Sequence, residues 1–398
     1  MSTREELIKQ FAAAEEREKK QKQEESEEKK IPLSSPSEEH GKSSKARKKA
    51  RQRKKFFKTV RNVLTDKTLS KMLNVFLFCM IANVIEYFFL INYLGVPTKG
   101  VVSKIAGILI ILGYMYSARL KPSNIGFSTK PKSVLSAVRN AGIANLAIIP
   151  AYILEFVYLL AKGHKPIIRI FAYEAVYSEV GPVYFIANIL LLLVINTVSI
   201  VMLEVLFRGI LIKMGKGKFG FWQTSIIISA FYSIWYLIIP LSKVTAGYKS
   251  MQLISLCIFY LIFEFCISIK WCMLTRATGS IWFALFDHLF FNILVGLIHL
   301  VSTAEGLTNY IDINRNYRLI VIQLISFVFC FIYYKRKMHR KEQLLQKAGI
   351  RSLYVFDSLA EMSEEDVSRQ AERIKTADGE IDAEYLRLLE KNQNNRHR

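Results

Sequence analysis

The sequence predicts an all-α fold, a polytopic membrane helical bundle with about eight transmembrane helices. Of its 398 residues, 52% are hydrophobic and the mean hydropathy is +0.22, although the formal net charge is 55 − 33 = +22. This combination is typical of membrane proteins whose charge lies in loops and tails. Apolar runs of about 20 residues, long enough to cross the hydrocarbon as a helix, repeat along the chain.

The expected spans follow one another after a polar start. Their limits are 72–94, 101–118, 141–161, 183–207, 220–240, 252–272, 280–301 and 317–334. Because the first 70 residues are polar, we expect no cleavable signal peptide. We therefore divide the chain into a charged tail, accessory helices, a core and a second charged tail, with limits 1–70, 71–179, 180–335 and 336–398.

Basic residues in the connections predict the orientation of the spans. Lys and Arg concentrate before the first span, between spans two and three, between spans four and five, and after span eight. With eight spans these segments share one side, which the positive-inside rule assigns to the cytoplasm. Both termini are then cytoplasmic. The connection 162–182 carries Lys162, Lys165 and Arg169 and is a mild exception on the outer side.

The N-terminal tail has an acidic–basic part and a purely basic part. Residues 1–30 mix Glu and Lys closely, which favours a fraying solvated helix, with disorder as the alternative. The segment 42–61 holds 11 basic residues and no acid. It predicts either a clamp on anionic lipid, with about 1 kcal/mol per residue, or only a topology signal. We expect no nucleic acid as a partner, since no aromatic platform is interleaved with the charge. The candidate lipid-binding residues are Lys48, Lys49, Arg51, Arg53, Lys54 and Lys55.

The C-terminal tail carries two possible short helices. Ser363 with Asp366 three residues later predicts a capping box that opens a helix. A second helix is expected over 381–392, with an apolar stripe at helical spacing. The tail is either a protein-docking element or a disordered segment, and both interpretations remain open.

Polar residues inside the expected spans are costly and need a structural or functional reason. We interpret Glu86, Glu155 and Glu264 as structural, each facing another helix. Glu204 and Arg208 stand four residues apart, on one helix face, and predict an ion pair. The remaining candidates are Asp287, His288, Asn292 and His299.

His288 and Asn292 have the same spacing on the seventh span, and His299 falls near that face again. An imidazole beside an amide can stabilise an oxyanion or orient a water molecule. Hydrogen bonding between helices is the equally weighted alternative. The chain has no HExxH motif, and His288 has no second His at helical ligand spacing, so we expect no metal and no cofactor.

Three stretches carry a family resemblance, namely LEVLFRGIL, ISAFYSIWYL and RATGSIWFALFDHLFFNIL. They resemble the CPBP family, which comprises the type II CAAX prenyl endopeptidases, lysostaphin resistance protein A and bacteriocin-processing relatives of the Abi group. The family pattern is Glu-Glu-x-x-x-Arg, then Phe-x-x-x-His, then His-x-x-x-Asn/Asp after an Arg-Thr-Gly-Ser-Leu/Ile-Trp run. This chain matches that run at Arg276, Gly279, Ser280, Ile281 and Trp282. The resemblance implies a CPBP-type transmembrane core within 180–335.

The departures from the pattern concern the catalytic positions. Leu203 stands where the family has the first Glu, which the resemblance implies is the base that activates the hydrolytic water. Trp235 stands where the family has the His of the second motif, four residues after Phe231. The residual motif residues, which are the candidate catalytic positions, are Glu204, Arg208, His288 and Asn292.

The resemblance therefore implies a catalytically degenerate family member, a pseudoprotease, that binds and regulates another membrane or cell-envelope protein. Its partner would be a membrane protein or a transmembrane segment held in the helical cavity. By analogy with lysostaphin resistance protein A, we expect a multi-pass protein in the plasma membrane of a Gram-positive bacterium. The alternative is an active intramembrane endopeptidase with a shifted base, either Glu204 or His288. A transporter is disfavoured, since no internal repeat is visible.

Overall fold

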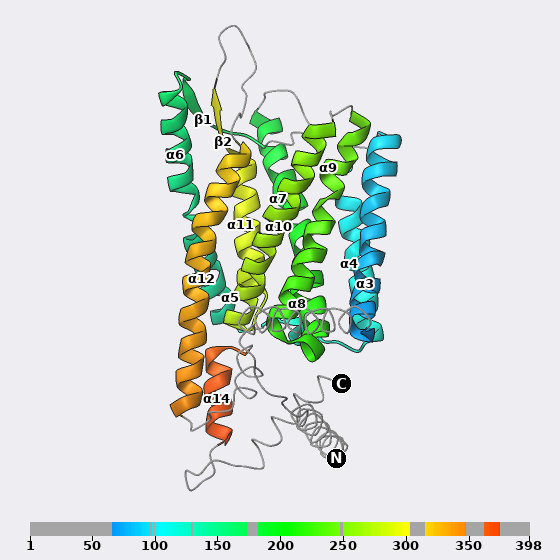
Figure 1. Ribbon diagram of the computed structural model, residues 1–398, viewed down its shortest axis with the longest axis vertical. Helices are drawn as coiled ribbons and strands as arrows, with labels where there is room; N and C mark the ends of the chain where they lie inside the picture. Colours follow the sequence, from blue (N-terminus) through cyan, green and yellow to red (C-terminus); the bar gives the residue numbers. More distant parts are fainter. Residues whose placement is uncertain are drawn as a thin grey trace, which may run out of the picture.

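The computed structural model describes residues 66–95, 98, 100–128, 130–172, 182–246, 250–302, 315–347 and 362–374. Helices dominate this part of the chain, which confirms the all-α polytopic bundle (Figure 1). Six helical stretches within it are long and apolar enough to cross a membrane. They are Lys67–Tyr93, Pro131–Ala161, Phe185–Lys216, Lys218–Ser242, Ser250–Thr278 and Asn316–Lys347. The shorter apolar helices Val101–Ser117 and Trp282–Leu297 occupy the other two expected spans.

The described elements follow one another along the chain. The helices of the first half are α3 (Lys67–Val84), η1 (Ile85–Tyr93), α4 (Val101–Ser117), η2 (Pro122–Ile125), α5 (Pro131–Asn145), α6 (Ile148–Ala161) and α7 (Pro182–Glu204). Those of the second half are η3 (Val205–Leu211), α8 (Ile212–Tyr236), α9 (Ile238–Ser242), η4 (Lys243–Ala246), α10 (Ser250–Thr278), α11 (Trp282–Leu297), α12 (Arg315–Lys347) and α14 (Glu364–Ile374). The strands are β1 (Pro166–Ile170) and β2 (Ile298–Ser302).

The basic connections meet at one end of the bundle, which we call the basic end. Lys218 forms an ion pair with Asp66 at the start of α3, with Nζ 3.5 Å from Oδ2. In the turn between α10 and α11, the backbone N–H of Ile281 donates to the carbonyl oxygen of Gly126. Figure 1 shows this end at the bottom, where α8 begins and α12 ends. That this end faces the cytoplasm remains a prediction.

Gly220 marks the bend between the fourth and fifth spans. Its φ of +70° lies in the left-handed region, which glycine adopts without the strain that a Cβ atom brings. The kink therefore falls at residue 220, where the fifth span was expected to start, whereas the helical stretch before it continues to Lys216, past the expected end at residue 207.

Several expected span limits were wrong. The fourth, sixth and eighth spans extend to Lys216, Thr278 and Lys347 instead of ending at residues 207, 272 and 334. The third span starts at Pro131 rather than at residue 141, because α5 and α6 follow each other with a break of two residues after Asn145. The seventh span ends at Leu297 rather than at residue 301. Beyond Leu297 the chain becomes extended, and β2 pairs antiparallel with β1, with Ile168 opposite Leu300.

His299 therefore does not share a helix face with His288, and that expectation was wrong. His299 lies in β2, where its Nε2 atom is 3.1 Å from the carbonyl oxygen of Phe171 and its ring stacks on Phe171. The apolar run that ends α11 contains β-branched residues, which suit a strand as well as a helix. Pairing with β1, which is distant in sequence, makes this segment a strand rather than a continuation of the helix.

Buried acids in the accessory helices have structural partners, as expected for Glu86 and Glu155. Glu86 accepts hydrogen bonds from the backbone N–H groups of Val102 (3.0 Å) and Ser103 (2.7 Å), and so caps the start of α4. Glu155 on α6 pairs with Arg318 on α12 at 2.8 Å, and both side chains are almost fully buried. Glu264 is buried on α10.

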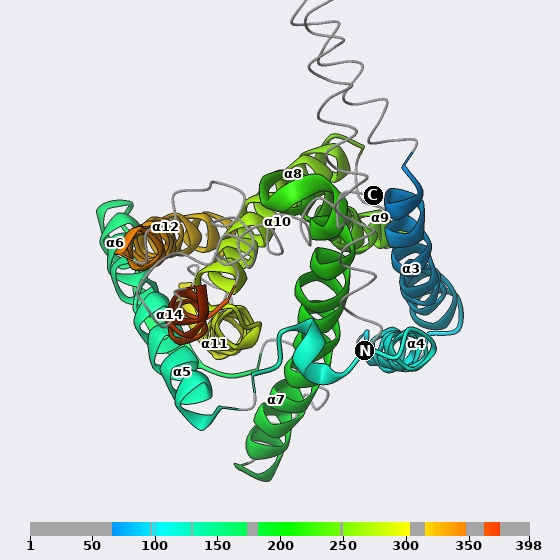
Figure 2. The same cartoon turned by 90° about the horizontal axis from the view of Figure 1, so that it is seen from below.

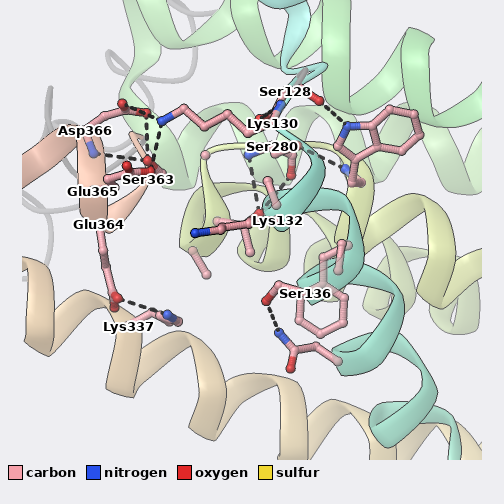
Figure 3. A pocket seen from close by; sticks show the side chains of 18 of the residues that line it. Ser128, Lys130, Lys132, Ser136, Ser280, Lys337, Ser363, Glu364, Glu365 and Asp366 are labelled. Atoms are coloured by element: carbon pink, nitrogen blue, oxygen red, sulfur yellow. Dashed lines mark hydrogen bonds and ion pairs between the residues drawn. The ribbon is translucent and has the colours of Figure 1, made fainter.

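The helix α14 docks on the basic end of the bundle. The predicted helix start is confirmed, since the Ser363 hydroxyl accepts from the backbone N–H of Asp366 (3.1 Å). The Asp366 carboxylate accepts from that hydroxyl (2.7 Å), whereas a full capping box would have it accept from the backbone N–H of Ser363. Lys130 lies 3.0 Å from Glu365 and 3.2 Å from Asp366, and Lys337 lies 3.1 Å from Glu364. These acids form one wall of a polar cavity of about 610 Å³ (Figure 3). The expected helix over 381–392 lies outside the described residues, as do the N-terminal segments 1–30 and 42–61.

Ion pairs between Lys130 and the acids Glu365 and Asp366 hold α14 against the bundle. Burial opposes the ionisation of Asp366, but hydrogen bonds from Ser363 and Lys130 outweigh it and hold the pKa of Asp366 below its ordinary value. Hydrogen bonds to Glu365 and then to Asp366 raise the pKa of Lys130. The two shifts have opposite signs and both favour the charged pair.

We predict that Lys130→Glu releases α14, because it replaces attraction to Glu365 and Asp366 by repulsion. Hydrogen exchange of the backbone amides in 364–374 then becomes at least severalfold faster, toward the rate of an unprotected helix. Lys121→Glu makes the same charge change at an exposed position of the basic end and serves as the control. Equal exchange rates in the two variants would contradict the docking role of Lys130.

The same contacts predict a flat pH response around neutrality. A carboxyl with a lowered pKa contributes stability above its ordinary pKa and loses it as pH falls through the lowered value. A lysine with a raised pKa contributes below its ordinary pKa and loses it as pH rises through the raised value. Exchange protection of α14 should therefore stay constant between about pH 5 and 9, and fall in stronger acid or base. A midpoint near neutral pH would contradict this assignment.

Candidate functional site

The site begins where α7 passes into a π-helical turn. Glu204 is the last residue of α7, and Arg208 lies within η3, a segment with the wider π-helical hydrogen-bond pattern. The Nε atom of Arg208 lies 3.4 Å from Oε2 of Glu204, and both side chains are fully buried. The predicted ion pair is therefore confirmed.

The second oxygen of Glu204 contacts α11. Oε1 lies 2.9 Å from Nδ1 of His288, a residue 84 positions later in the chain. The structure thus joins the retained residues of the first and third motifs around one carboxylate. Asn292 lies one turn further along α11 and is half-buried. None of the hydrogen bonds between described residues connects Asn292 to His288, so their joint role as an oxyanion pair stays a prediction.

Aromatic rings surround this charge cluster. The Trp271 ring stacks on His288, with centroids 3.9 Å apart, and the Tyr232 ring approaches His288 edge-on at 6.4 Å. The guanidinium of Arg208 lies over Tyr232 (4.5 Å) and Trp271 (5.0 Å). Arg208 also donates to the Ser268 hydroxyl at 3.0 Å. Cation–π contacts and this hydrogen bond supplement the single carboxylate partner of Arg208.

A second buried ion pair positions Trp271. Lys270 on α10 lies 2.7 Å from Oδ2 of Asp287 on α11, and the indole N–H of Trp271 donates to the same oxygen at 2.8 Å. Asn145 on α5 donates to Oδ1 of Asp287 at 3.1 Å. Lys270 further donates to Gln323 on α12. Helices α5 and α10 therefore contact Asp287 of α11 directly, and α12 joins them through Lys270; Asp287 holds the ring that stacks on His288.

The sequence analysis missed Lys270, Trp271 and Asn145. Lys270 was visible as a charge inside an expected span, a sign that it needs a buried partner. Nothing local pointed to Trp271 or Asn145, because their role depends on contacts with Asp287 from other helices.

The positions where the family has its base are filled by apolar side chains. Leu203 and Trp235 are each 2% exposed. Trp235 packs edge-on against Phe207, and Nζ of Lys104 on α4 lies 4.7 Å from its ring centroid. Lys104 is held there by Asn83, whose side-chain oxygen accepts at 2.9 Å. Both positions are thus part of the packed interior.

The chemistry open to this cluster follows from its three charged or polar groups. A carboxylate within hydrogen-bond distance of an imidazole is an arrangement that supports general base catalysis. Here the same carboxylate also neutralises Arg208, and Glu204, Arg208 and His288 are at most 1% exposed. Within the described ranges, no three His, Cys, Asp or Glu side chains are grouped to hold a metal ion.

Residues 185–294 match the family model of the type II CAAX prenyl endopeptidase Rce1-like proteins. The matched segment contains Glu204, Arg208, Trp235, His288 and Asn292, so the resemblance found in the motifs is confirmed. This chain is a multi-pass helical membrane protein with an Rce1-like domain of the CPBP type. No curated protein matches the chain.

We predict that Arg208→Met destabilises the bundle, because it leaves the buried Glu204 carboxylate without its guanidinium. The expected loss is about 3–5 kcal/mol of unfolding free energy. In Glu204→Gln/Arg208→Met, where neither charge remains, part of that loss should return. Denaturant unfolding in detergent micelles measures both.

The exposed cation Arg336 on α12 supplies a control for this comparison, and Arg336→Met should change stability by about 0.5 kcal/mol or less. If Arg208→Met unfolds at the same denaturant concentration as Arg336→Met, the buried pair does not stabilise the bundle.

Proposed function

We propose that this chain is a catalytically degenerate CPBP-type protein that binds and regulates another membrane or cell-envelope protein. The observation that carries the proposal is the packing of Leu203 and Trp235, each 2% exposed, at the two positions where the family has its Glu and His. Leucine and tryptophan side chains cannot accept the proton of a hydrolytic water.

The retained polar residues suit a structural role. Oε1 of Glu204 contacts His288 at 2.9 Å, and Oε2 lies 3.4 Å from Nε of Arg208 in an ion pair without a hydrogen bond, so both oxygens face neighbours within the protein. In this proposal the cluster fixes α7, η3 and α11 to each other and keeps the family's helical arrangement.

The regulated partner in this proposal is a membrane protein or transmembrane segment held by the bundle. We place the protein in the plasma membrane, with the basic end and both termini in the cytoplasm, because Lys and Arg concentrate in the connections of that end. The segment 42–61 would add attraction to anionic lipid. A Gram-positive host follows only from the analogy with lysostaphin resistance protein A.

One observation favours an active endopeptidase as the second candidate. The 2.9 Å contact between Glu204 and His288 is a ready carboxylate–imidazole pair, and His288 keeps a second ring nitrogen. Hydrolysis through this pair requires an opening that admits water and a peptide to residues that are now at most 1% exposed. The pseudoprotease interpretation requires no such opening.

We predict that affinity purification from the native membrane in mild detergent yields a full-length partner in near-stoichiometric amount. Intact-mass spectrometry should give the same partner mass with the wild-type chain and with His288→Ala. A scaffold does not use the imidazole as a base, so its loss leaves the partner uncut in both cases.

The control variant for this experiment is His299→Ala, which removes an imidazole in β2, away from Glu204. A partner that is truncated with the wild type and with His299→Ala, but full-length with His288→Ala, would establish cleavage and overturn the proposal. Comparable expression of all three chains has to be shown by immunoblotting.

A further inference from the structure

A cavity of about 440 Å³ opens at the basic end, separate from Glu204 and His288. Its walls come from α8, α10 and α12, which lie side by side along one edge of the bundle (Figure 2). The lining residues are Phe221, Trp222, Arg276, Tyr334, Lys335, Met338, His339 and Glu342.

The charge of the cavity is positive on the side nearest the membrane. Arg276, at the end of α10, is 7% exposed, and its guanidinium lies 4.3 Å from the ring centroid of Phe221. Lys335 is exposed on α12. The acid in the lining, Glu342, lies two turns further from the membrane and is 4.0 Å from His339. Two cations therefore line the cavity, and its carboxylate lies near His339 and accepts a hydrogen bond from Gln346 at 3.4 Å.

Aromatic side chains lie beside these cations. Phe221 packs against Trp222 and Tyr334, with centroid distances of 5.1 and 6.3 Å. Trp222 remains 49% exposed. Tryptophan and tyrosine concentrate where the hydrocarbon meets the headgroups, because their rings are apolar and their polar atoms need water. The cavity thus combines an interfacial aromatic wall with positive charge.

Apolar side chains continue from the cavity toward the middle of the bundle. On α12, Phe331, Val328 and Leu324 share one face below Lys335 and are 39%, 58% and 62% exposed. On α8, Ile226 follows Trp222 by one turn and is 52% exposed. A soluble anion would not use these surfaces, whereas acyl chains attached to an anionic headgroup would cover them.

We propose that this cavity binds the headgroup of an anionic phospholipid, with its phosphate between Arg276 and Lys335 and its acyl chains along α8 and α12. This site is distinct from the basic segment 42–61 and does not depend on whether the chain cleaves peptides.

Fluorescence quenching by brominated lipids tests the proposal at the site itself. The full-length chain is reconstituted in vesicles of phosphatidylcholine with increasing brominated phosphatidylglycerol, and in a parallel series with brominated phosphatidylcholine. The Trp222→Phe variant gives the background from the other three tryptophans. The Trp222 signal should be quenched at a lower mole fraction of the anionic lipid than of the zwitterionic lipid.

Charge variants separate this site from the general attraction of a basic surface. Lys335→Gln should lower the preference for the anionic lipid about fivefold. The neighbouring Arg336→Gln, which removes an equal charge outside the cavity lining, should leave it unchanged. If the Arg276→Gln variant folds, it should lower the preference for the anionic lipid as Lys335→Gln does. If it does not fold, the comparison of Lys335→Gln with Arg336→Gln tests the proposal.

Two results would overturn the proposal. Equal quenching by both lipids, or equal effects of Lys335→Gln and Arg336→Gln, would show that the cavity has no headgroup preference. Relief of quenching by millimolar glycerol 3-phosphate would show a site for small anions rather than for a lipid.

Discussion

A charge that is surrounded by hydrocarbon must meet an opposite charge or enough hydrogen bonds, and this constraint organises the whole bundle. Apolar side chains give little specificity to helix pairing in a membrane, because lipid tails are as apolar as leucine. Buried pairs are more selective. Glu155 with Arg318 fixes α6 to α12, Lys270 with Asp287 fixes α10 to α11, and Glu204 with His288 fixes α7 to α11. Breaking one leaves a charge that hydrocarbon cannot solvate.

Under the proposed function, the same constraint explains how the site loses its base and keeps its architecture. Leu203 and Trp235 stand where the resembled motifs have ionisable residues, bring no group that needs water, and fit within the packed interior. What remains is a carboxylate with a guanidinium on one oxygen and an imidazole on the other. Such a cluster pairs its charges within the protein, although Oε2 of Glu204 and Nε and Nη1 of Arg208 make no hydrogen bond among the described residues. In the proposed function it joins α7, η3 and α11. In this view catalysis and scaffolding are alternative uses of one arrangement of helices.

The sequence was sufficient where the relevant contacts are local. Span positions follow from apolar length, the ion pair of Glu204 and Arg208 from a spacing of four, and the start of α14 from Ser363 as its cap. It was insufficient where distant residues decide. The bond between Glu204 and His288 and the stacking of Trp271 on His288 depend on how α7, α10 and α11 pack. His299 was misplaced because its apolar surroundings fit a helix and a strand equally, until β1 supplies the pairing partner.

Because η3 is a π-helical turn, the geometry of the first motif depends on the number of residues in this turn as well as on their types. In such a turn each backbone N–H reaches five residues back instead of four, so the segment accommodates one residue more than an α-helix of the same height. Deleting one residue within Val205–Leu211 can restore an ordinary α-helix. The helix before the deletion would then rotate by about 100° relative to α8. The carboxylate of Glu204 would leave His288 although every motif residue was still present. A relative of this chain can therefore lose the site through a gap in its alignment, without any substitution.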